Sequence, residues 1–141
     1  MTRGERGSAT VEFTLLLPAL LLLFGVVVGG GRLWFARSAV LEASGAGARA
    51  ATLARSAAEA RVSATSVVNA ELARAGVRCA AARIAVDTAA FGTPVGTPAS
   101  VTVSVECGVP LSDVLVPGWP GVLAVSATGS SVLDPYRGRT P

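Results

Sequence analysis

A single carboxylate stands at the entrance to a long apolar segment. Glu12 is followed by Phe13–Gly31, a stretch without any charged side chain. An acidic side chain at the centre of a bilayer costs about 2.5–3.5 kcal/mol, and less near its edge. An ionisable group in such a place is therefore a candidate for a functional role, and its partner has to be identified.

The other residue types argue against catalysis. The chain has no His and no Lys, which excludes Ser-His and Ser-Lys nucleophiles and Schiff bases and removes the commonest metal ligand. The glycines at Gly29–Gly31 and Gly45–Gly47 lack the lysine of a phosphate-binding loop and do not follow a strand pattern. The carboxylates are scattered, and one of them, Glu71, is placed to pair with Arg74. We expect no enzyme activity, no cofactor and no metal.

The basic residues do not indicate nucleic-acid binding. The formal net charge is +3, and the arginines are spread along the chain, mostly alternating with acids. Proteins that bind nucleic acids usually gather their arginines and lysines into a basic patch. We therefore expect no nucleic-acid partner.

Two cysteines, Cys79 and Cys107, are the only thiols. They cannot complete a tetrahedral zinc site without further ligands. If this part of the chain lies outside the cytoplasm, a disulfide is the natural interpretation, and it would add about 3–4 kcal/mol. The alternative is a pair of buried, reduced thiols.

The apolar segment has the length of a membrane-spanning helix. At 1.5 Å per residue, Phe13–Gly31 covers about 28 Å, close to the bilayer core of about 30 Å. Arg3 and Arg6 precede it, which places the N-terminus in the cytoplasm and the residues after Arg32 outside, with Trp34 as an interfacial anchor.

A removed secretory signal is the competing interpretation of this segment. A signal has a shorter apolar region of about 7–15 residues, and it has no use for a carboxylate such as Glu12. Gly29–Gly31 would offer only a weak cleavage site. We therefore favour a retained anchor. Pro18 lies inside the segment, where it either kinks the helix or is simply tolerated, as proline often is in membranes.

The remainder of the chain predicts an α+β domain. Helices are expected at about residues 36–55 and 57–75, separated by a capping box in which Ser56 is the N-cap and Glu59 the third helical residue. Small residues recur along the first of these helices and form either a core contact with the chain's own sheet, which we favour, or a surface for a partner. The expected apolar stripe of the second helix comprises Val62, Thr65, Val68, Leu72 and Ala75.

Beyond Gly76 the hydrophobic period changes from helix to strand. Strands are expected at about residues 83–87, 100–107 and 123–133, and the second of them alternates most cleanly. Residues 91–98 are expected to connect the first two strands. The segment Pro110–Gly121 holds three prolines and Trp119 and predicts a rigid loop. Helices packed on one face of a small antiparallel sheet are the expected architecture.

The N-terminal residues resemble a known family. The run Arg6–Phe13 (Arg-Gly-Ser-Ala-Thr-Val-Glu-Phe), the apolar stretch Leu17–Gly25 and the Ala/Gly-rich segment Ala43–Ala51 are similar to TadE-like minor pseudopilins of the tight-adherence (Flp-type) pilus system, within the type IV pilin class. The specific resemblance covers about the first 50 residues, and the rest agrees only in layout.

The resemblance implies how the chain is processed and assembled. Residues 1–7 would be a cytoplasmic leader that a prepilin peptidase removes between Gly7 and Ser8. Residues 8–35 would be the transmembrane and assembly helix, with Glu12 and Phe13 setting the register against the new amine of a neighbouring subunit. Residues 36–141 would form the extracytoplasmic domain of a pilin-like fold, on a helix running unbroken from the membrane.

The implied partners are prepilin peptidase, other pilins or pseudopilins, the inner-membrane assembly platform and membrane lipid. Two other functions stay open on the sequence. One is a membrane-tethered binding module, for which Trp119 is the nominated contact residue, although a core position explains it better. The other is a secreted soluble protein released after Gly31.

Overall fold

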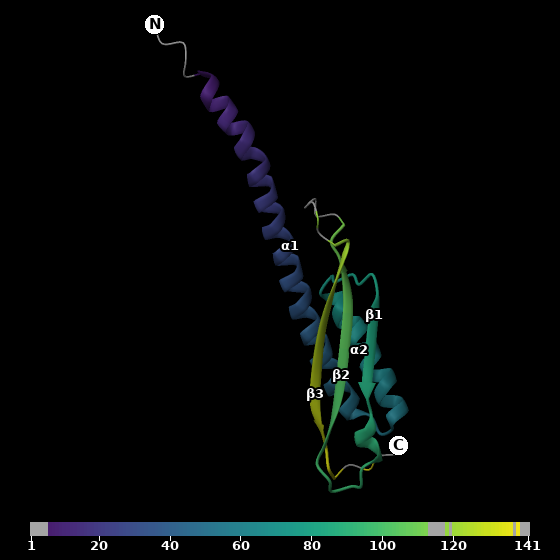
Figure 1. Cartoon of the computed structure of the whole chain (residues 1–141). Coiled ribbons are helices and arrows are strands. Elements are labelled where there is room, and N and C mark those ends of the chain that lie inside the picture. The colour runs from purple at the N-terminus through teal and green to yellow at the C-terminus, as the bar shows by residue number, and fades with distance from the viewer. Residues whose placement is uncertain (1–5, 113–117, 119, 137, 139–141) are drawn as a thin grey trace.

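The computed structural model describes residues 6–112, 118, 120–136 and 138, with side chains from Glu12 onward except that of Leu15. Two α-helices precede a small β-sheet, and a short 3-10 helix lies in the connection between the first two strands (Figure 1). The elements are α1 (Arg6–Leu53), α2 (Ala57–Arg74), β1 (Ala82–Asp87), η1 (Ala89–Gly92), β2 (Ala99–Pro110) and β3 (Val122–Leu133). The expected α+β class, with a long N-terminal helix and an antiparallel sheet, is confirmed.

Helix α1 is one continuous element of 48 residues, with Pro18 inside it. At 1.5 Å per residue its length is about 72 Å. Its N-terminal half projects away from the rest of the molecule, whereas its C-terminal half packs against α2 and the sheet (Figure 1). Pro18 therefore does not interrupt the helix.

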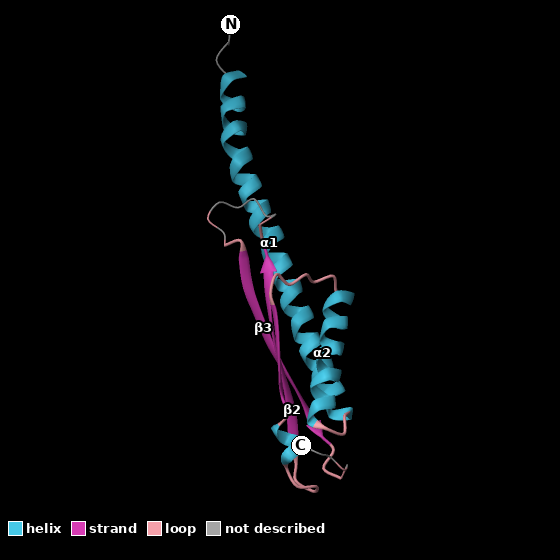
Figure 2. Ribbon diagram, turned by 90° about the vertical axis from the view of Figure 1, so that its right-hand side faces the viewer, coloured by secondary structure: helices cyan, strands magenta, loops and turns pink. Residues whose placement is uncertain are grey.

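A capping box starts α2, as the sequence predicts. Ser56 has the extended backbone of an N-cap, and its hydroxyl accepts a hydrogen bond of 3.2 Å from the backbone N–H of Glu59. The Glu59 carboxylate accepts from the backbone N–H of Arg55 at 2.9 Å, one residue before the cap. This sharp restart lets α2 run back alongside α1 (Figure 2).

The buried face of α2 differs from the expected stripe. Val62 is 72% exposed, so its assignment to the core was wrong. The buried positions recur every four residues, and they are Ala60, Ala64, Val68 and Leu72. Two of these four are alanines, and α1 comes close to α2 at one of them, since a methyl group on Gly47 would lie 3.4 Å from the Ala64 carbonyl oxygen.

The three strands form an antiparallel sheet in the order β1-β2-β3. In the central strand, Val103 is paired with Val86 on one side and with Gly129 on the other. Every second residue of β2 is buried, and these residues are Val101, Val103, Val105, Cys107 and Val109. Both helices cover this face of the sheet, as Figure 2 shows, and the opposite face of β2 carries Ser100, Thr102, Ser104 and Glu106.

Helix α1 touches the sheet at backbone distance. A methyl group built on Gly129 of β3 would lie 2.5 Å from the backbone nitrogen of Gly45. Ser44 is fully buried there, and its hydroxyl donates a 2.8 Å hydrogen bond to the carbonyl of Leu41. Two residues farther along α1, a methyl group on Gly47 would lie 2.6 Å from a methyl of Val68. The small-residue stripe of α1 is thus a core contact with the chain's own sheet and with α2, as favoured.

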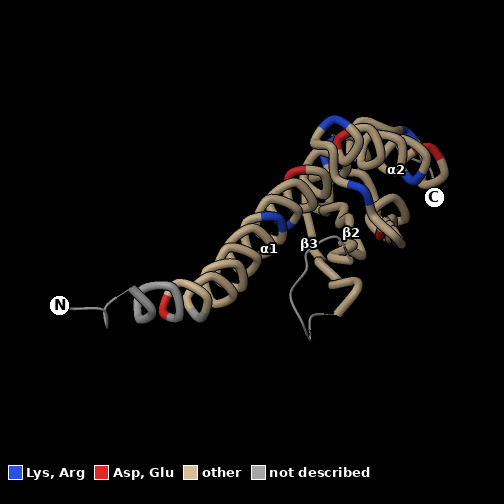
Figure 3. Tube along the Cα trace, turned by 90° about the horizontal axis from the view of Figure 1, so that it is seen from above, with Lys and Arg blue, Asp and Glu red and all other residues tan. Residues whose placement is uncertain are grey.

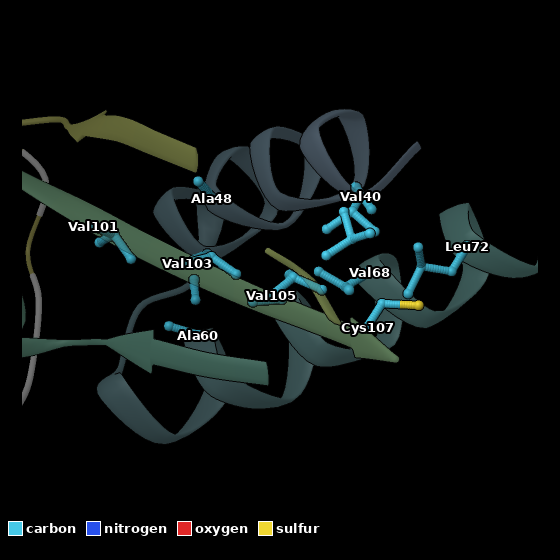
Figure 4. Packing of buried hydrophobic residues seen from close by; sticks show 14 of the residues in the cluster. Val40, Ala48, Ala60, Val68, Leu72, Val101, Val103, Val105 and Cys107 are labelled. Atoms are coloured by element: carbon cyan, nitrogen blue, oxygen red, sulfur yellow. The ribbon is translucent and has the colours of Figure 1, made fainter. Parts of the chain in front are cut away.

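The core is otherwise built from valine and alanine. Figure 4 shows Val101, Val103 and Val105 of the central strand facing side chains of both helices, among them Val40 and Val68. Also buried in the core are Leu72, Leu111, Leu133 and Cys107. Its one aromatic side chain among the described residues is Phe91, which is 2% exposed and is carried by η1. The sequence pattern predicts only a connection between two strands at this residue and does not indicate its place in the core. Close by, Arg61 of α2 donates a 2.8 Å hydrogen bond to the hydroxyl of Thr88.

Cys79 and Cys107 are joined by a disulfide, with their Cα atoms 5.2 Å apart. Cys79 lies in the segment between α2 and β1, and Cys107 is fully buried in β2. Two backbone hydrogen bonds flank the bridge, from Ala80 to the Gly108 carbonyl at 2.8 Å and from Gly108 to the Ala81 carbonyl at 2.9 Å. The bridge therefore fastens the connection after α2 to the middle of the sheet.

The close approach at Gly129 generates a stability prediction. We expect Gly129→Ala to lower the free energy of unfolding by about 1–3 kcal/mol, because the added methyl forces α1 and β3 apart. The matched control is Gly45→Ala, whose new methyl has only an Arg49 guanidinium nitrogen nearby, at 3.8 Å. That control should keep or raise stability, since alanine favours helix by about 1 kcal/mol. Thermal unfolding of the full chain in detergent micelles, followed by circular dichroism, measures both. Equal midpoints for Gly129→Ala and the wild type would contradict this packing.

The disulfide generates a second stability prediction. It closes a loop with a sequence separation of 28, so its removal should cost about 3–4 kcal/mol on loop-entropy grounds. We expect Cys79→Ser with Cys107→Ser to unfold at a clearly lower denaturant midpoint than the wild type. Reductant should lower the wild-type midpoint by a similar amount and leave the double variant unchanged. A double variant as stable as the oxidised wild type would refute the structural role of the bridge.

Candidate functional site

The candidate processing and assembly residues lie at the start of α1. Gly7 and Ser8 are in its first turn, and Glu12 and Phe13 follow in the next. Glu12 is exposed, and Phe13 is 68% exposed. These four residues are at the end of the molecule farthest from the domain (Figure 1). A second chain can therefore reach them without meeting the domain of the first.

The helical spacing places Ser8 and Glu12 on one face of α1. Residues four apart in an α-helix are neighbours on its surface, about 6 Å apart along the axis. The unsatisfied N–H groups of the first turn give this end of the helix a partial positive charge. Glu12 lies beyond that first turn, where this charge has fallen off, and its carboxylate can attract a cation, above all an amine.

The segment that follows Glu12 has the properties of a membrane-spanning helix. Among the residues that the structure describes, one helical stretch, Glu12–Leu53, is long and apolar enough to cross a membrane, with a mean hydropathy of 2.4 in its most apolar part. Only 6% of that part is buried inside the molecule. A core helix of a soluble domain would be mostly buried. Figure 3 shows this half of the helix as a long run without charged positions.

The domain begins immediately beyond this apolar part. Leu33 is partly buried, Ala36 is 3% exposed, and from there the inward face of α1 belongs to the core. The helix is continuous through Gly29–Gly31. The anchor and the domain are thus joined by the same rigid helix, with no linker between them.

Metal ligands and ion pairs are the other candidate features within the described part of the domain. No group of three or more His, Cys, Asp or Glu side chains is close enough to hold a metal there. Glu71 and Arg74 form the expected ion pair at 2.6 Å on the surface of α2. Hydrogen bonding to Glu71 raises the pKa of the Arg74 guanidinium, which is charged in any case. Trp119, the nominated contact of a binding module, lies outside the described residues.

One surface near the membrane segment was not found by sequence reasoning. Two hollows flank α1 where it enters the domain, and they are lined by Phe35 and Arg78 on one side and by Arg37 on the other. The sequence does carry a signal for this surface, namely two pairs of an arginine and an aromatic residue, with the members of each pair three positions apart. Only Trp34 was recognised in the sequence as an interfacial residue.

Comparison with known proteins identifies the N-terminal segment. The family model described as TadE-like protein matches residues 7–49. The match begins at Gly7, includes Glu12 and Phe13, and ends in the packed half of α1. No curated protein and no solved structure matches the chain. The resemblance to TadE-like proteins is therefore confirmed for this segment.

Proposed function

We propose that this chain, whose residues 7–49 are TadE-like, is a minor pseudopilin of a tight-adherence (Flp-type) pilus or secretion apparatus. The family match is the observation that carries the proposal, because it includes the leader glycine, the acid and the apolar helix together. The TadE-like segment supports involvement in the tight-adherence pilus system. The chain acts in that system through assembly and has no catalytic role.

The precursor is anchored in the bacterial cytoplasmic membrane as a single-pass protein. Its N-terminus is cytoplasmic and its domain extracytoplasmic, in agreement with Arg3 and Arg6 before the apolar segment. A prepilin peptidase hydrolyses the Gly7–Ser8 peptide bond, consuming one water, and leaves an amine on Ser8. Removal of the leader takes away two arginines and one glutamate, so the net side-chain charge falls from +3 to +2.

The new amine is the partner of Glu12 in an adjoining subunit. A buried ion pair often only offsets the cost of removing its two charges from water, so the gain in affinity is small. Its contribution is geometric. A subunit displaced along the filament axis leaves both an amine and a carboxylate without a partner in an apolar environment. The packing of Phe13 helps to set the same axial position of the subunit.

The exposure of the apolar half of α1 supports this mode of assembly. Most of its described apolar side chains are exposed, and Leu20, for example, is 65% exposed. Lipid covers such a surface in the membrane, and the helices of other pilins or pseudopilins can cover it in a filament. The domain leaves this half uncovered, so a subunit moves from one setting to the other without unfolding. The inner-membrane assembly platform is the implied partner for that step, in which the chain primes or helps to assemble the filament.

The two alternative functions predict different N-terminal residues for the mature protein. A membrane-tethered binding module would keep Met1, and a secreted protein would begin near Arg32. Continuous helix through Gly29–Gly31, with Ala36 already in the core, favours a retained segment over a removed one. The first residue of the mature protein distinguishes all three.

Replacing the leader glycine is expected to block maturation. Gly7→Leu puts a bulky side chain at the cleaved bond, so the protein should keep residues 1–7, whereas the wild type should begin at Ser8. Gly4→Leu, in the same leader but away from the bond, is the control and should be processed normally. Mass spectrometry of protein extracted from membranes reads the N-terminus directly. A wild type that begins at Met1 while pili are being made would rule out the proposed processing.

Replacing the acid is expected to separate cleavage from assembly. Glu12→Gln keeps the size of the side chain but removes its charge, so we expect normal removal of the leader and a reduction of about tenfold or more in recovery with partner pilins. The variant would leave the amine of the adjoining subunit buried without a counter-charge, which costs at least about 1–3 kcal/mol and corresponds to that loss. Glu42→Gln, an exposed acid on the same helix, is the control. Cross-linking and co-purification from membranes measure the effect, and equal recovery for both variants would remove the role assigned to Glu12.

A further inference from the structure

The membrane-facing end of the domain has two hollows, one on each of two nearly opposite faces of α1. The first has a volume of about 470 Å³ and is lined by Arg32 and Phe35 of α1, by Arg78 and by the end of β2. The second, of about 460 Å³, is lined by Trp34 and Arg37 of α1 and by the start of β3. At 100° per residue the two sets of α1 residues face directions about 150° apart.

Both hollows combine an arginine with an aromatic side chain three positions away. Arg32 and Phe35 contribute this pair to the first, and Trp34 and Arg37 contribute it to the second. The aromatic rings are directed outward, since Trp34 is 78% and Phe35 59% exposed. Aromatic rings favour the boundary between hydrocarbon and water, and arginines near it attract anionic headgroups.

Every charged side chain among the described residues that line these hollows is an arginine. No acidic side chain is among the described residues that line either of them. The first hollow has a second arginine, Arg78, which comes from the segment after α2 and not from the membrane helix. Two guanidinium groups from separate elements beside one hollow form a site that suits a phosphate.

The level of these residues along α1 matches the lipid headgroups. Arg32 is the first charged residue after the apolar segment, and Arg37 is about 7.5 Å farther along the axis. The headgroup layer of one leaflet is about 5–8 Å thick. The arginines and rings of both hollows therefore lie in that layer when Phe13–Gly31 spans the hydrocarbon.

We propose that the membrane-facing end of the domain binds anionic phospholipid, with the lipid phosphate in the hollow between Arg32 and Arg78 and a second contact at Trp34 and Arg37. The inference rests on the retained, single-pass anchor of the proposed function, but it does not depend on cleavage or on Glu12. Bound headgroups hold the domain at a fixed height and orientation on the membrane before the subunit is taken into an assembly.

The test compares lipids on the full chain. The protein in detergent micelles is incubated with equal amounts of phosphatidylglycerol and phosphatidylcholine, and native mass spectrometry gives the ratio of the two lipids that remain bound. We expect the wild type to retain phosphatidylglycerol preferentially. Arg78→Gln should lower that preference about fivefold, the effect of one arginine near an anionic surface. Arg78→Lys, which keeps the charge, should retain most of it.

The control is Arg55→Gln, which makes the same change of net charge at the far end of the domain and should leave the preference unchanged. No preference in the wild type, or an equal loss in Arg55→Gln, would overturn the proposal. Inorganic phosphate added in excess distinguishes a lipid site from a site for a free anion. Displacement of the phosphatidylglycerol by it would also overturn the proposal, because acyl chains beside α1 should hold the lipid. Normal processing and assembly in a chain without lipid preference would refute this inference alone.

Discussion

The contact between α1 and the sheet at Gly129 is the constraint on which the domain depends. At this point a helix backbone and a strand backbone meet with no side chain between them. Such an approach maximises dispersion contacts per unit area, but it requires glycine in the strand and a small residue, Ser44, on the helix. The Ala/Gly-rich composition of the second half of α1 follows from this requirement. The same closeness explains why the first half of α2 presents alanines to the core and why a single large aromatic, Phe91, is accommodated only at the far end.

The two halves of α1 consequently differ in amino-acid composition, and each composition suits a different environment. The N-terminal half uses Leu and Val, which gain by contact with lipid or other helices, and the C-terminal half uses Ala, Gly and Ser, which gain by close packing. Because the helix is continuous, the position of the anchor determines the position of the sheet. A displacement of α1 along the membrane normal therefore moves the whole domain, and the disulfide helps the connection after α2 to follow it.

The parts of the fold that could be predicted are those in which local chemistry and tertiary packing agree. Alternation in β2 and the Ser56 cap of α2 are local signals, and the structure has both of them. The buried face of α2 was predicted wrongly because Val62 is more apolar than Ala60. Where two helices pack closely, the size of a side chain decides which residue is buried, and the smaller Ala60 is buried. The burial of Phe91 was not predicted because η1 is a single short turn among Gly, Pro and Thr residues. Only the tertiary packing around η1 places this side chain in the core. Gly129 carried no local signal, since its partner on α1 is distant in sequence.

The site could be predicted in part for the same reason. Gly7, Glu12 and the apolar helix form a contiguous pattern that a family model also detects, whereas the hollow at Arg32 and Arg78 depends on the folding of the chain around α1. The two features are linked by the energetics of leaving the bilayer. The apolar segment has an acid at one end and arginines at the other, so in the proposed transfer from membrane to filament both ends would exchange one electrostatic environment for another. The proposed processing would supply a cation for the acid, so that end would lose little. At the other end the arginines would lose the proposed lipid phosphate and gain water or an acidic neighbour, and this difference would set how readily the subunit leaves the membrane.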